Sequence, residues 1–301
     1  MKRFISMLKN MVSMIFAKLI IIGLRCFESF LIHINVEDKN AFKMWLFNFF
    51  LNISIILYRI ERGKFRACVY IKHTNNYNDE FILLELNTKE KFYIRRKMFS
   101  SDISSIIETF IFRQYERNSD NLKNKIILDI GAHIGDSAVY FAKLGGDVYS
   151  YEPSKELYDI AIKNAKLNNC AVNFFNKGVG DKNGRFKLLH HKDGANLAST
   201  TLFDDDYDNI DPNTKKEEID IISFFDLLNQ FKSVYLAKID CEGCEFKIFK
   251  SLNSNDLDKI EHFIIEYHKE QPDEIVALLK NNGFNVQTNK TSNSLIFADK
   301  I

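Results

Sequence analysis

The sequence predicts an α/β protein built on a doubly wound, mostly parallel β-sheet that ends in an antiparallel hairpin. From residue 125 onward, strand-like apolar runs alternate with helix-like runs. The run KIILDI, residues 125–130, is almost continuously apolar, as expected when both faces of a parallel sheet are covered. No helical pattern separates the last two runs, NVQTNK and SNSLIFAD, so they predict a hairpin.

The elements of this region follow from local patterns. Ser154 precedes a helical run with Glu156 in its first turn, which predicts an N-cap at Ser154. The pair Gly145 and Gly146 ends the helix before it. We expect strands at 125–130, 147–153, 172–180, 184–191, 234–241 and 260–268, the hairpin at 285–299, and helices at 137–145, 154–169, 221–231, 246–252 and 272–284.

An N-terminal helical and small β extension is expected before the sheet. Residues 1–65 carry ten Lys/Arg against four Asp/Glu and two apolar runs of about 15 residues, shorter than a membrane span needs. These runs predict helices that pack on the rest of the chain or on a second copy in a homo-oligomer, or that lie on an anionic membrane surface through residues 1–58. Within 66–120 we expect strands at 66–73, 80–86 and 91–96 and a helix at 100–116, capped by Ser101 or Asp102. The predicted domains are therefore 1–65, 66–120 and 121–301.

Composition narrows the class of protein. With 41 Lys/Arg and 40 Asp/Glu, the formal net charge is +1, which disfavours a nucleic-acid partner. The 5 cysteines are odd in number and scattered, unlike a secreted disulfide framework. We therefore expect reduced thiols and a cytoplasmic protein, with membrane association left open by the N-terminal runs.

The stretch LDIGAHIGD, residues 128–136, joins a strand to a helix through a glycine turn. Glu152 lies 21 residues after Gly131, the spacing at which a carboxylate can bind ribose hydroxyls, so a ribose-bearing cofactor is expected. The dinucleotide pattern G-x-G-x-x-G has only its first glycine here, because His133 and Asp136 occupy the other two places. Asp129 also suits a ligand with an ammonium and a sulfonium better than one with phosphates.

Five segments together resemble one known family. They are ILDIGAHIGDSAVYFA, SYEPSKELYDIAIKNAKLNN, NKGVGDKNG, LAKIDCEGCEFKIFKSL and IEHFIIEYH. In order and spacing they are similar to the FkbM family of S-adenosylmethionine-dependent methyltransferases over about residues 90–300, and IDCEGCE is the most family-specific of them. The resemblance implies a class I methyltransferase fold, S-adenosylmethionine as cofactor and O-methylation of a sugar, glycan or other small metabolite. His133 departs from the family's usual Asn.

The resemblance also implies cofactor-binding residues. Asp129, Gly131 and Gly135 would hold the methionine end of S-adenosylmethionine, and Glu152 would hold its ribose. Asp181, in the loop after the third strand, would lie near the adenine, although the KNG that follows it also fits a surface turn.

Acidic residues and a histidine lie at the ends of the strands expected at 234–241 and 260–268, where the acceptor is expected. His268 is the natural general base, with Asp240 and Glu242 beside it, because a hydroxyl must lose a proton to accept a methyl group. His268 could instead be satisfied by neighbouring backbone. Asp240 and Glu242 could instead bind a divalent cation or only orient the acceptor, and no residue is assigned as a metal ligand.

Two further hypotheses remain open. The pair Cys241 and Cys244 is expected to have no metal or redox role, with Cys241 in the sheet core and Cys244 on a helix face. A dinucleotide-dependent oxidoreductase is a rival enzyme. A membrane-peripheral binding protein that keeps the cofactor pocket without catalysis is the rival from another class.

Overall fold

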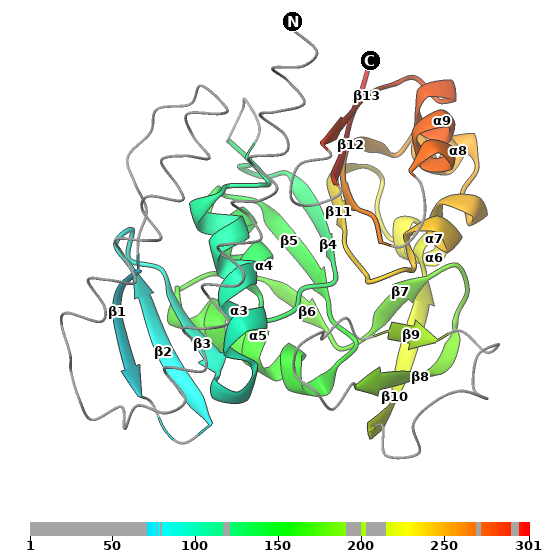
Figure 1. Ribbon diagram of the computed structural model, residues 1–301. Helices are drawn as coiled ribbons and strands as arrows, with labels where there is room; N and C mark the ends of the chain where they lie inside the picture. The colour runs from blue at the N-terminus through cyan, green and yellow to red at the C-terminus, as the bar shows by residue number, and fades with distance from the viewer. Residues whose placement is uncertain are drawn as a thin grey trace, which may run out of the picture. The chain divides into compact units, whose positions relative to one another are not determined.

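The computed structural model describes eight stretches of the chain. Its contacts divide the chain into two compact units, one ending at Glu116 and the other beginning at Arg117 (Figure 1). The described residues are 71–76, 78, 80–116, 121–190, 200–202, 215–268, 272–289 and 295–301.

The N-terminal predictions fall outside these residues. The two apolar runs of 1–65 and the start of the strand expected at 66–73 are not described. Within the described ranges, no helix is long and apolar enough to cross a membrane. Packing or membrane contact of residues 1–58 stays a prediction.

The first unit contains a three-stranded antiparallel sheet in the order β1-β2-β3. Alternation of apolar residues along β2 and β3 buries Leu84, Leu86, Phe92 and Ile94 completely. The elements are β1 (Ile71–Asn76), β2 (Phe81–Leu86), β3 (Lys91–Arg95), η1 (Arg96–Met98), α3 (Phe99–Ile106) and η2 (Ile107–Ile111).

The predicted N-cap of the helix in this unit, Ser101 or Asp102, was wrong. The α-helix begins at Phe99, and Asp102 lies inside it with a fully buried side chain. Its carboxylate accepts hydrogen bonds from the backbone N–H of Arg95 at 2.7 Å and from the Arg95 guanidinium at 3.1 and 2.7 Å. A buried ion pair thus takes the oxygens that a cap would have used. The helical segment also ends at Ile111, before the expected residue 116.

The second unit is built on a seven-stranded sheet in the order β6-β5-β4-β11-β12-β14-β13. Only β14 runs against the other strands, because it pairs antiparallel with β12 and with β13. The predicted fold class is therefore confirmed, and the closing hairpin inserts its last strand between β12 and β13. The strands are β4 (Ile126–Ile130), β5 (Asp147–Tyr151), β6 (Asn173–Phe175), β11 (Val234–Ile239), β12 (Ile260–Glu266), β13 (Phe284–Asn289) and β14 (Leu295–Lys300).

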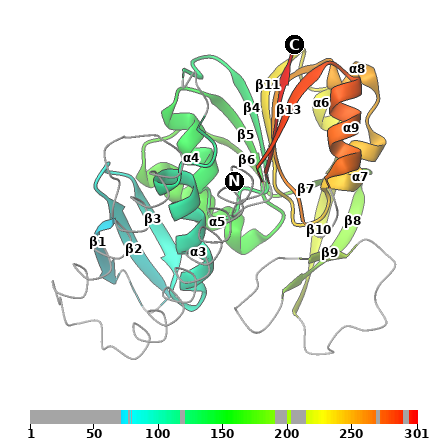
Figure 2. The ribbon, with the colours of Figure 1, turned by 45° about the horizontal axis from the view of Figure 1, so that its top comes forward.

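Helices cover both faces of this sheet. Figure 2 shows α4 and α5 on one face and α6 to α9 on the other. The central strands β4 and β11 are nearly all apolar, and Leu128, Ile130, Ala237 and Ile239 are at most 1% exposed. The helices are α4 (Asp136–Lys143), α5 (Lys155–Leu167), α6 (Phe224–Leu228), α7 (Glu245–Ser251), α8 (Ser254–Leu257) and α9 (Asp273–Asn281). Ser154 precedes α5 as predicted, but its side chain makes no capping hydrogen bond.

A second, four-stranded sheet corrects two further predictions. The strand expected at 172–180 is two strands, β6 in the large sheet and β7 (Gly178–Gly180) in the small one. Residues 221–223, expected to begin the helix of 221–231, instead end β10 (Lys215–Ser223), and α6 begins at Phe224. Buried and exposed side chains alternate along β10, and Ile219 and Ile221 are buried with Phe186 and Leu188 of β8. The order is β7-β10-β8-β9, with β8 at Gly184–His190 and β9 at Thr200–Leu202.

Candidate active site

The turn after β4 contains three residues whose backbone is in the left-handed conformation. Gly131, His133 and Gly135 have φ angles of 81°, 49° and 84°. A Cβ on Gly131 would lie 1.8 Å from the carbonyl oxygen of Asp240, and one on Gly135 would lie 2.9 Å from Ala161. Glycine is therefore required at both positions, whereas histidine is among the residues that tolerate the left-handed region. His133, where the family usually has Asn, is therefore compatible with this turn.

Glu152 holds the turn from the neighbouring strand. It follows β5 and is 5% exposed. One carboxylate oxygen accepts the backbone N–H of His133 and the other accepts that of Ser154, both at 2.9 Å. The backbone N–H groups of Gly131 and Ala132 bond to the carbonyl oxygen of Tyr151. These hydrogen bonds hold the turn of residues 131–135 against the end of β5.

Asp129 lies underneath this turn. It is fully buried near the end of β4, where it accepts hydrogen bonds from Ser150 at 2.7 Å and from Ser137 at 3.0 and 3.1 Å. Burial raises the pKa of Asp129, while Lys238, 3.6 Å away, and the two serines oppose the rise. This carboxylate is engaged by protein groups, so its direct contact with a cofactor remains a prediction.

Lys238 is a site residue that the sequence reasoning missed. It is 2% exposed, and its Nζ donates to the carbonyl oxygen of Gly131 at 2.7 Å and lies 3.3 Å from Asp240 Oδ2. Burial alone lowers the pKa of Lys238, but Asp240 and Asp129 raise it above its usual range, so the side chain is charged. The signal was present in the sequence, since Lys238 is the sole charged residue of β11.

Asp181 follows β7. Its Oδ1 is buried and has no hydrogen-bond partner within the part of the chain that the structure describes. A buried acceptor without a donor carries a desolvation cost of about 1–3 kcal/mol, which a ligand donor would offset. Asp181 also begins an exposed turn, residues 182–184, so its place near the adenine stays a prediction.

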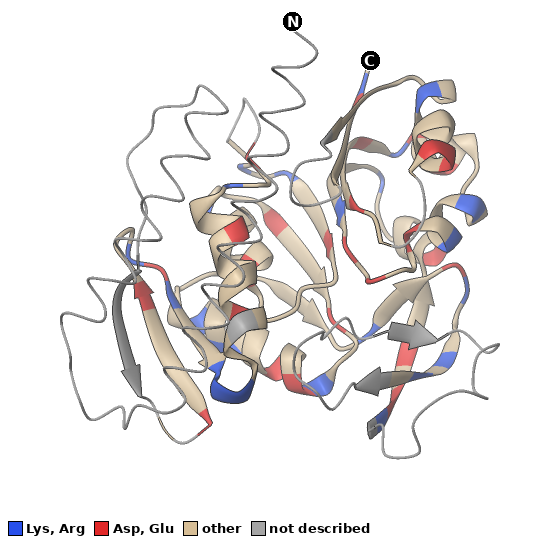
Figure 3. Ribbon diagram, viewed as in Figure 1, with Lys and Arg blue, Asp and Glu red and all other residues tan. Residues whose placement is uncertain are grey.

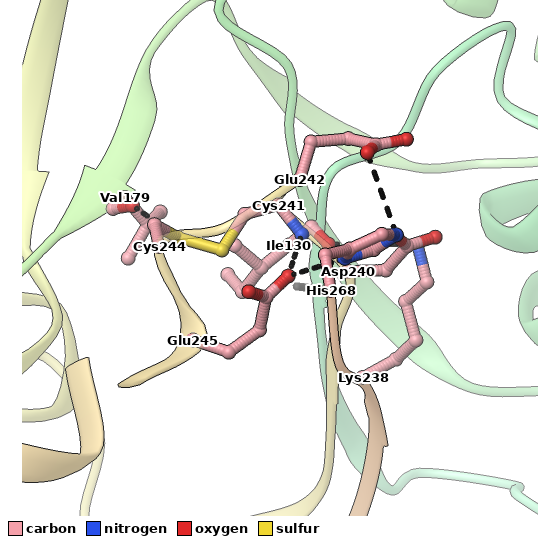
Figure 4. The surroundings of a disulfide bond; sticks show 9 residues. All are labelled: Ile130, Val179, Lys238, Asp240, Cys241, Glu242, Cys244, Glu245 and His268. Atoms are coloured by element: carbon pink, nitrogen blue, oxygen red, sulfur yellow. Dashed lines mark hydrogen bonds and ion pairs between the residues drawn. A yellow bond between two sulfur atoms is a disulfide. The ribbon is translucent and has the colours of Figure 1, made fainter. Parts of the chain in front are cut away.

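Asp240, Glu242 and His268 gather at the carboxyl ends of β11 and β12 (Figure 4). His268 Nε2 lies 3.4 Å from Glu242 Oε2 and 3.9 Å from Asp240 Oδ1. One ligand atom from each of the three residues falls within 4.8 Å of the others, close enough for a divalent cation. Figure 3 marks acidic residues in red along the connection from β11 to α7, which contains no Lys or Arg.

The other ring nitrogen of His268 faces Glu245, the first residue of α7. Nδ1 lies 3.1 Å from Glu245 Oε1, and Glu245 is 0% exposed. Burial lowers the pKa of His268, but the hydrogen bond that its ring donates to Glu245 and the charges of Glu242 and Asp240 raise the pKa overall to about 9. His268 is thus a cation at neutral pH surrounded by carboxylates, and the alternative of a histidine satisfied by backbone is not what the structure shows.

The expectation of reduced thiols was wrong for Cys241 and Cys244. Cys241 and Cys244 form a disulfide with a Cα–Cα distance of 5.5 Å, across the loop that carries Glu242 (Figure 4). Cys244 Sγ lies 3.2 Å from the carbonyl oxygen of Val179 in β7. Of the cysteines that are described, Cys170 is free. The sequence spacing allowed this bond, but only the left-handed turn at Glu242 and Gly243, with φ of 57° and 112°, brings the two residues together.

Comparison with known proteins gives one family and several distant relatives. The family model described as "Methyltransferase FkbM domain" matches residues 129–286, more than half of the chain. The chain is 24% identical over 184 residues to "Methyltransferase 1" of Beauveria bassiana (strain ARSEF 2860), covering 54% of this chain and 73% of that protein.

The solved structures are more distant. Magnesium protoporphyrin IX methyltransferase from Synechocystis PCC 6803 with bound SAM has 13% identity and a TM-score of 0.38, over 68% of this chain and 81% of that one. A Pyrococcus abyssi tRNA (uracil-54, C5)-methyltransferase has 14% identity and a TM-score of 0.38, over 80% of this chain and 52% of that one. Similarity at this level adds nothing to the assignment of the site.

Proposed function

The chain belongs to the FkbM family of methyltransferases, and from this premise we propose that it uses S-adenosylmethionine to methylate a hydroxyl oxygen of a sugar, glycan or other small metabolite. One observation carries the proposal. The cofactor turn and the loop with the acidic cluster are in van der Waals contact, since there is no room for a Cβ between Gly131 and the carbonyl oxygen of Asp240. A methyl donor on one side and an acceptor on the other would therefore be neighbours.

The residues present fit S-adenosylmethionine. Glu152 is anchored by two backbone N–H groups with its carboxylate at the end of β5, where ribose hydroxyls are bound in such sheets. The unpartnered oxygen of Asp181 suits the amino group of adenine. Gly131 and Gly135 let the backbone approach the methionine end, and Asp129 supports that turn from below. Bound S-adenosylmethionine would supply an electrophilic methyl group on its sulfonium.

His268 is the acceptor-side base in this proposal. Asp240 and Glu242 orient the acceptor and stabilise the imidazolium that forms when His268 takes the hydroxyl proton. The raised pKa of about 9 keeps the free protein's imidazole protonated at neutral pH. The positive charge of bound S-adenosylmethionine would lower the pKa of His268 and favour its neutral form.

Calorimetry tests the cofactor. We expect the native protein to bind S-adenosylmethionine and S-adenosylhomocysteine, and Glu152→Gln to weaken both by about 1–3 kcal/mol, roughly 5- to 150-fold. Glu156→Gln makes the same chemical change at an exposed position of α5 and should bind normally. Binding of NAD alone would support the oxidoreductase alternative. If none of the three ligands binds, the non-catalytic alternative gains and the proposal fails.

Methyl transfer tests the chemistry. Methyl-labelled S-adenosylmethionine is incubated with a panel of monosaccharides and phenols, and an alkali-stable methyl ether is the expected product. His268→Gln should lower turnover by about 10²- to 10⁴-fold with unchanged cofactor affinity. If turnover is unchanged when EDTA is added, no cation is needed and His268 is the base that deprotonates the acceptor. Loss with EDTA and recovery with Mg²⁺ or Mn²⁺ would instead assign Asp240, Glu242 and His268 to a cation.

A further inference from the structure

Glu245 is the best buried of the charged side chains around His268. It is the first residue of α7 and is 0% exposed. Its Oε1 accepts the backbone N–H of Cys241 at 3.1 Å and lies 3.1 Å from His268 Nδ1. Its Oε2 is buried and has no hydrogen-bond partner among the described residues. Glu245 is therefore a buried side chain that contacts both His268 and the loop of residues 240–244, which we call the acceptor loop.

This contact decides which nitrogen of His268 faces the acceptor side. Nδ1 points inward at Glu245, so Nε2 points towards Glu242 and Asp240 (Figure 4). Glu245, when ionised, can only accept a hydrogen bond, so a neutral His268 keeps the 3.1 Å contact as a hydrogen bond only when its proton is on Nδ1. The lone pair then lies on Nε2. A neutral imidazole in water prefers the other tautomer, with the proton on Nε2, so the pairing reverses the intrinsic preference.

The burial of Glu245 is costly unless the carboxylate has a specific partner. Removing an ionised carboxylate from water costs several kcal/mol, and one backbone N–H does not offset that. The ring of His268 supplies the missing donor. A glutamine at position 245 could accept the same N–H from Cys241 at no charge cost, so the backbone contact alone does not explain a carboxylate here.

We propose that Glu245 is a positioning residue that holds His268 with its proton on Nδ1, so that Nε2 receives the proton of the acceptor hydroxyl. This inference rests on the proposed function and deepens it. The O–H proton passes to Nε2, the acceptor oxygen forms a bond to the methyl carbon, and the bond from that carbon to sulfur breaks with its electron pair left on sulfur. His268 leaves the step as an imidazolium, stabilised by Glu245, and returns its proton to water.

The first experiment needs no acceptor. Protein labelled with ¹⁵N in histidine and saturated with S-adenosylhomocysteine is observed by NMR at a pH above the pKa of about 9, and the His268 signals are assigned by their loss in His268→Gln. We expect a protonated Nδ1 and an unprotonated Nε2 in the native protein. Glu245→Gln should move most of the proton to Nε2. Glu274→Gln, an exposed carboxylate that pairs with Lys250 on the surface, should leave the tautomer unchanged.

The second experiment is a double-mutant cycle on methyl transfer, measured with labelled S-adenosylmethionine and the panel compound that turns over. We expect Glu245→Gln to lower kcat by about 10²-fold or more with KM for the cofactor unchanged, and to have no further effect in the His268→Gln background. A role limited to the Cys241 backbone would lower kcat equally in both backgrounds.

Two results would overturn the inference: an unchanged His268 tautomer in Glu245→Gln, or additive losses in the cycle. Failure of the proposed function gives a different pattern. In that case, calorimetry shows no binding of S-adenosylmethionine, although the tautomer still responds to Glu245→Gln.

Discussion

The two halves of the candidate site are built in different ways. The shape of the cofactor half, from Gly131 to Glu152, is set by the left-handed backbone of its turn and by two backbone N–H groups that hydrogen-bond to Glu152. The acceptor half is made of side chains, with Glu242 and His268 both partly exposed and 3.4 Å apart. A turn of this kind tolerates no added Cβ, whereas a cluster of side chains responds to charge and pH.

A single methyl group should break the cofactor half. Gly131→Ala places a Cβ against the Asp240 carbonyl in a left-handed residue, and we expect a loss of about 4–5 kcal/mol in the free energy of unfolding with no measurable cofactor binding. Gly283→Ala is the matched control, because its φ is 78° and nothing lies within 4 Å of its Cβ. It should cost about 1–2 kcal/mol. Urea denaturation checks both, and equal losses would refute the steric argument.

Lys238 joins the two halves, so its loss should be the next largest effect. Lys238→Met leaves Asp129 buried without its cation, and we expect about 3–4 kcal/mol of destabilisation by urea denaturation. The double variant with Asp129→Asn should recover part of this loss, because no uncompensated charge remains. Lys250→Met removes an exposed pair with Glu274 and should change stability by less than about 0.5 kcal/mol. A silent Lys238→Met would mean that the two halves are held together by other contacts.

The acceptor half should make stability depend on pH. The pKa of His268 is raised from 6.5 to about 9, so its stabilising contribution is complete below about pH 6.5 and is lost as the pH rises to about 9. The total is at most about 3 kcal/mol. Denaturation curves across this interval should show the decline in the native protein, and His268→Gln should flatten it. The same slope in both proteins would assign the decline to other groups.

The disulfide of the acceptor loop should have the smallest effect. It closes a loop of four residues from Cys241 to Cys244, for which the chain-entropy model gives about 2 kcal/mol. Thermal unfolding with and without a dithiol reductant should show a stability difference of up to that size. Cys170→Ser is the control and should keep the same response to the reductant, since Cys170 is free. No response to the reductant in either protein would argue against the bond.

Local patterns predicted the sheet because each strand and helix carries its own signal. The apolar strands, the glycine turn and Glu152 could all be located without contacts, and the closing hairpin was recognised because no helical pattern separates its two strands. The pattern failed where charge masked alternation. Lys215–Ser223 contains five charged residues and its last three residues were expected in a helix, yet it forms a strand in which Ile219 and Ile221 are buried.

Side-chain partners were beyond the sequence in several places. The helix cap expected at Asp102 fails because Arg95, seven residues earlier, offers a buried ion pair. Lys238 was overlooked because an isolated lysine in a strand does not reveal the two carboxylates around it. The pairing of Glu245 with His268 joins residues 23 positions apart and has no spacing rule.

The sequence by itself determined the fold class, the position of the cofactor turn and the family resemblance, because glycine placement and apolar periodicity are local properties of the chain. Only the tertiary structure decided how the charged groups are used. It turns Asp129 inward onto Lys238 and two serines, and it gives His268 an inward nitrogen on Glu245 and an outward one on Glu242. The reason is that the parallel sheet brings the ends of β4, β11 and β12 to one edge, so the protonation state of each group depends on neighbours from other strands.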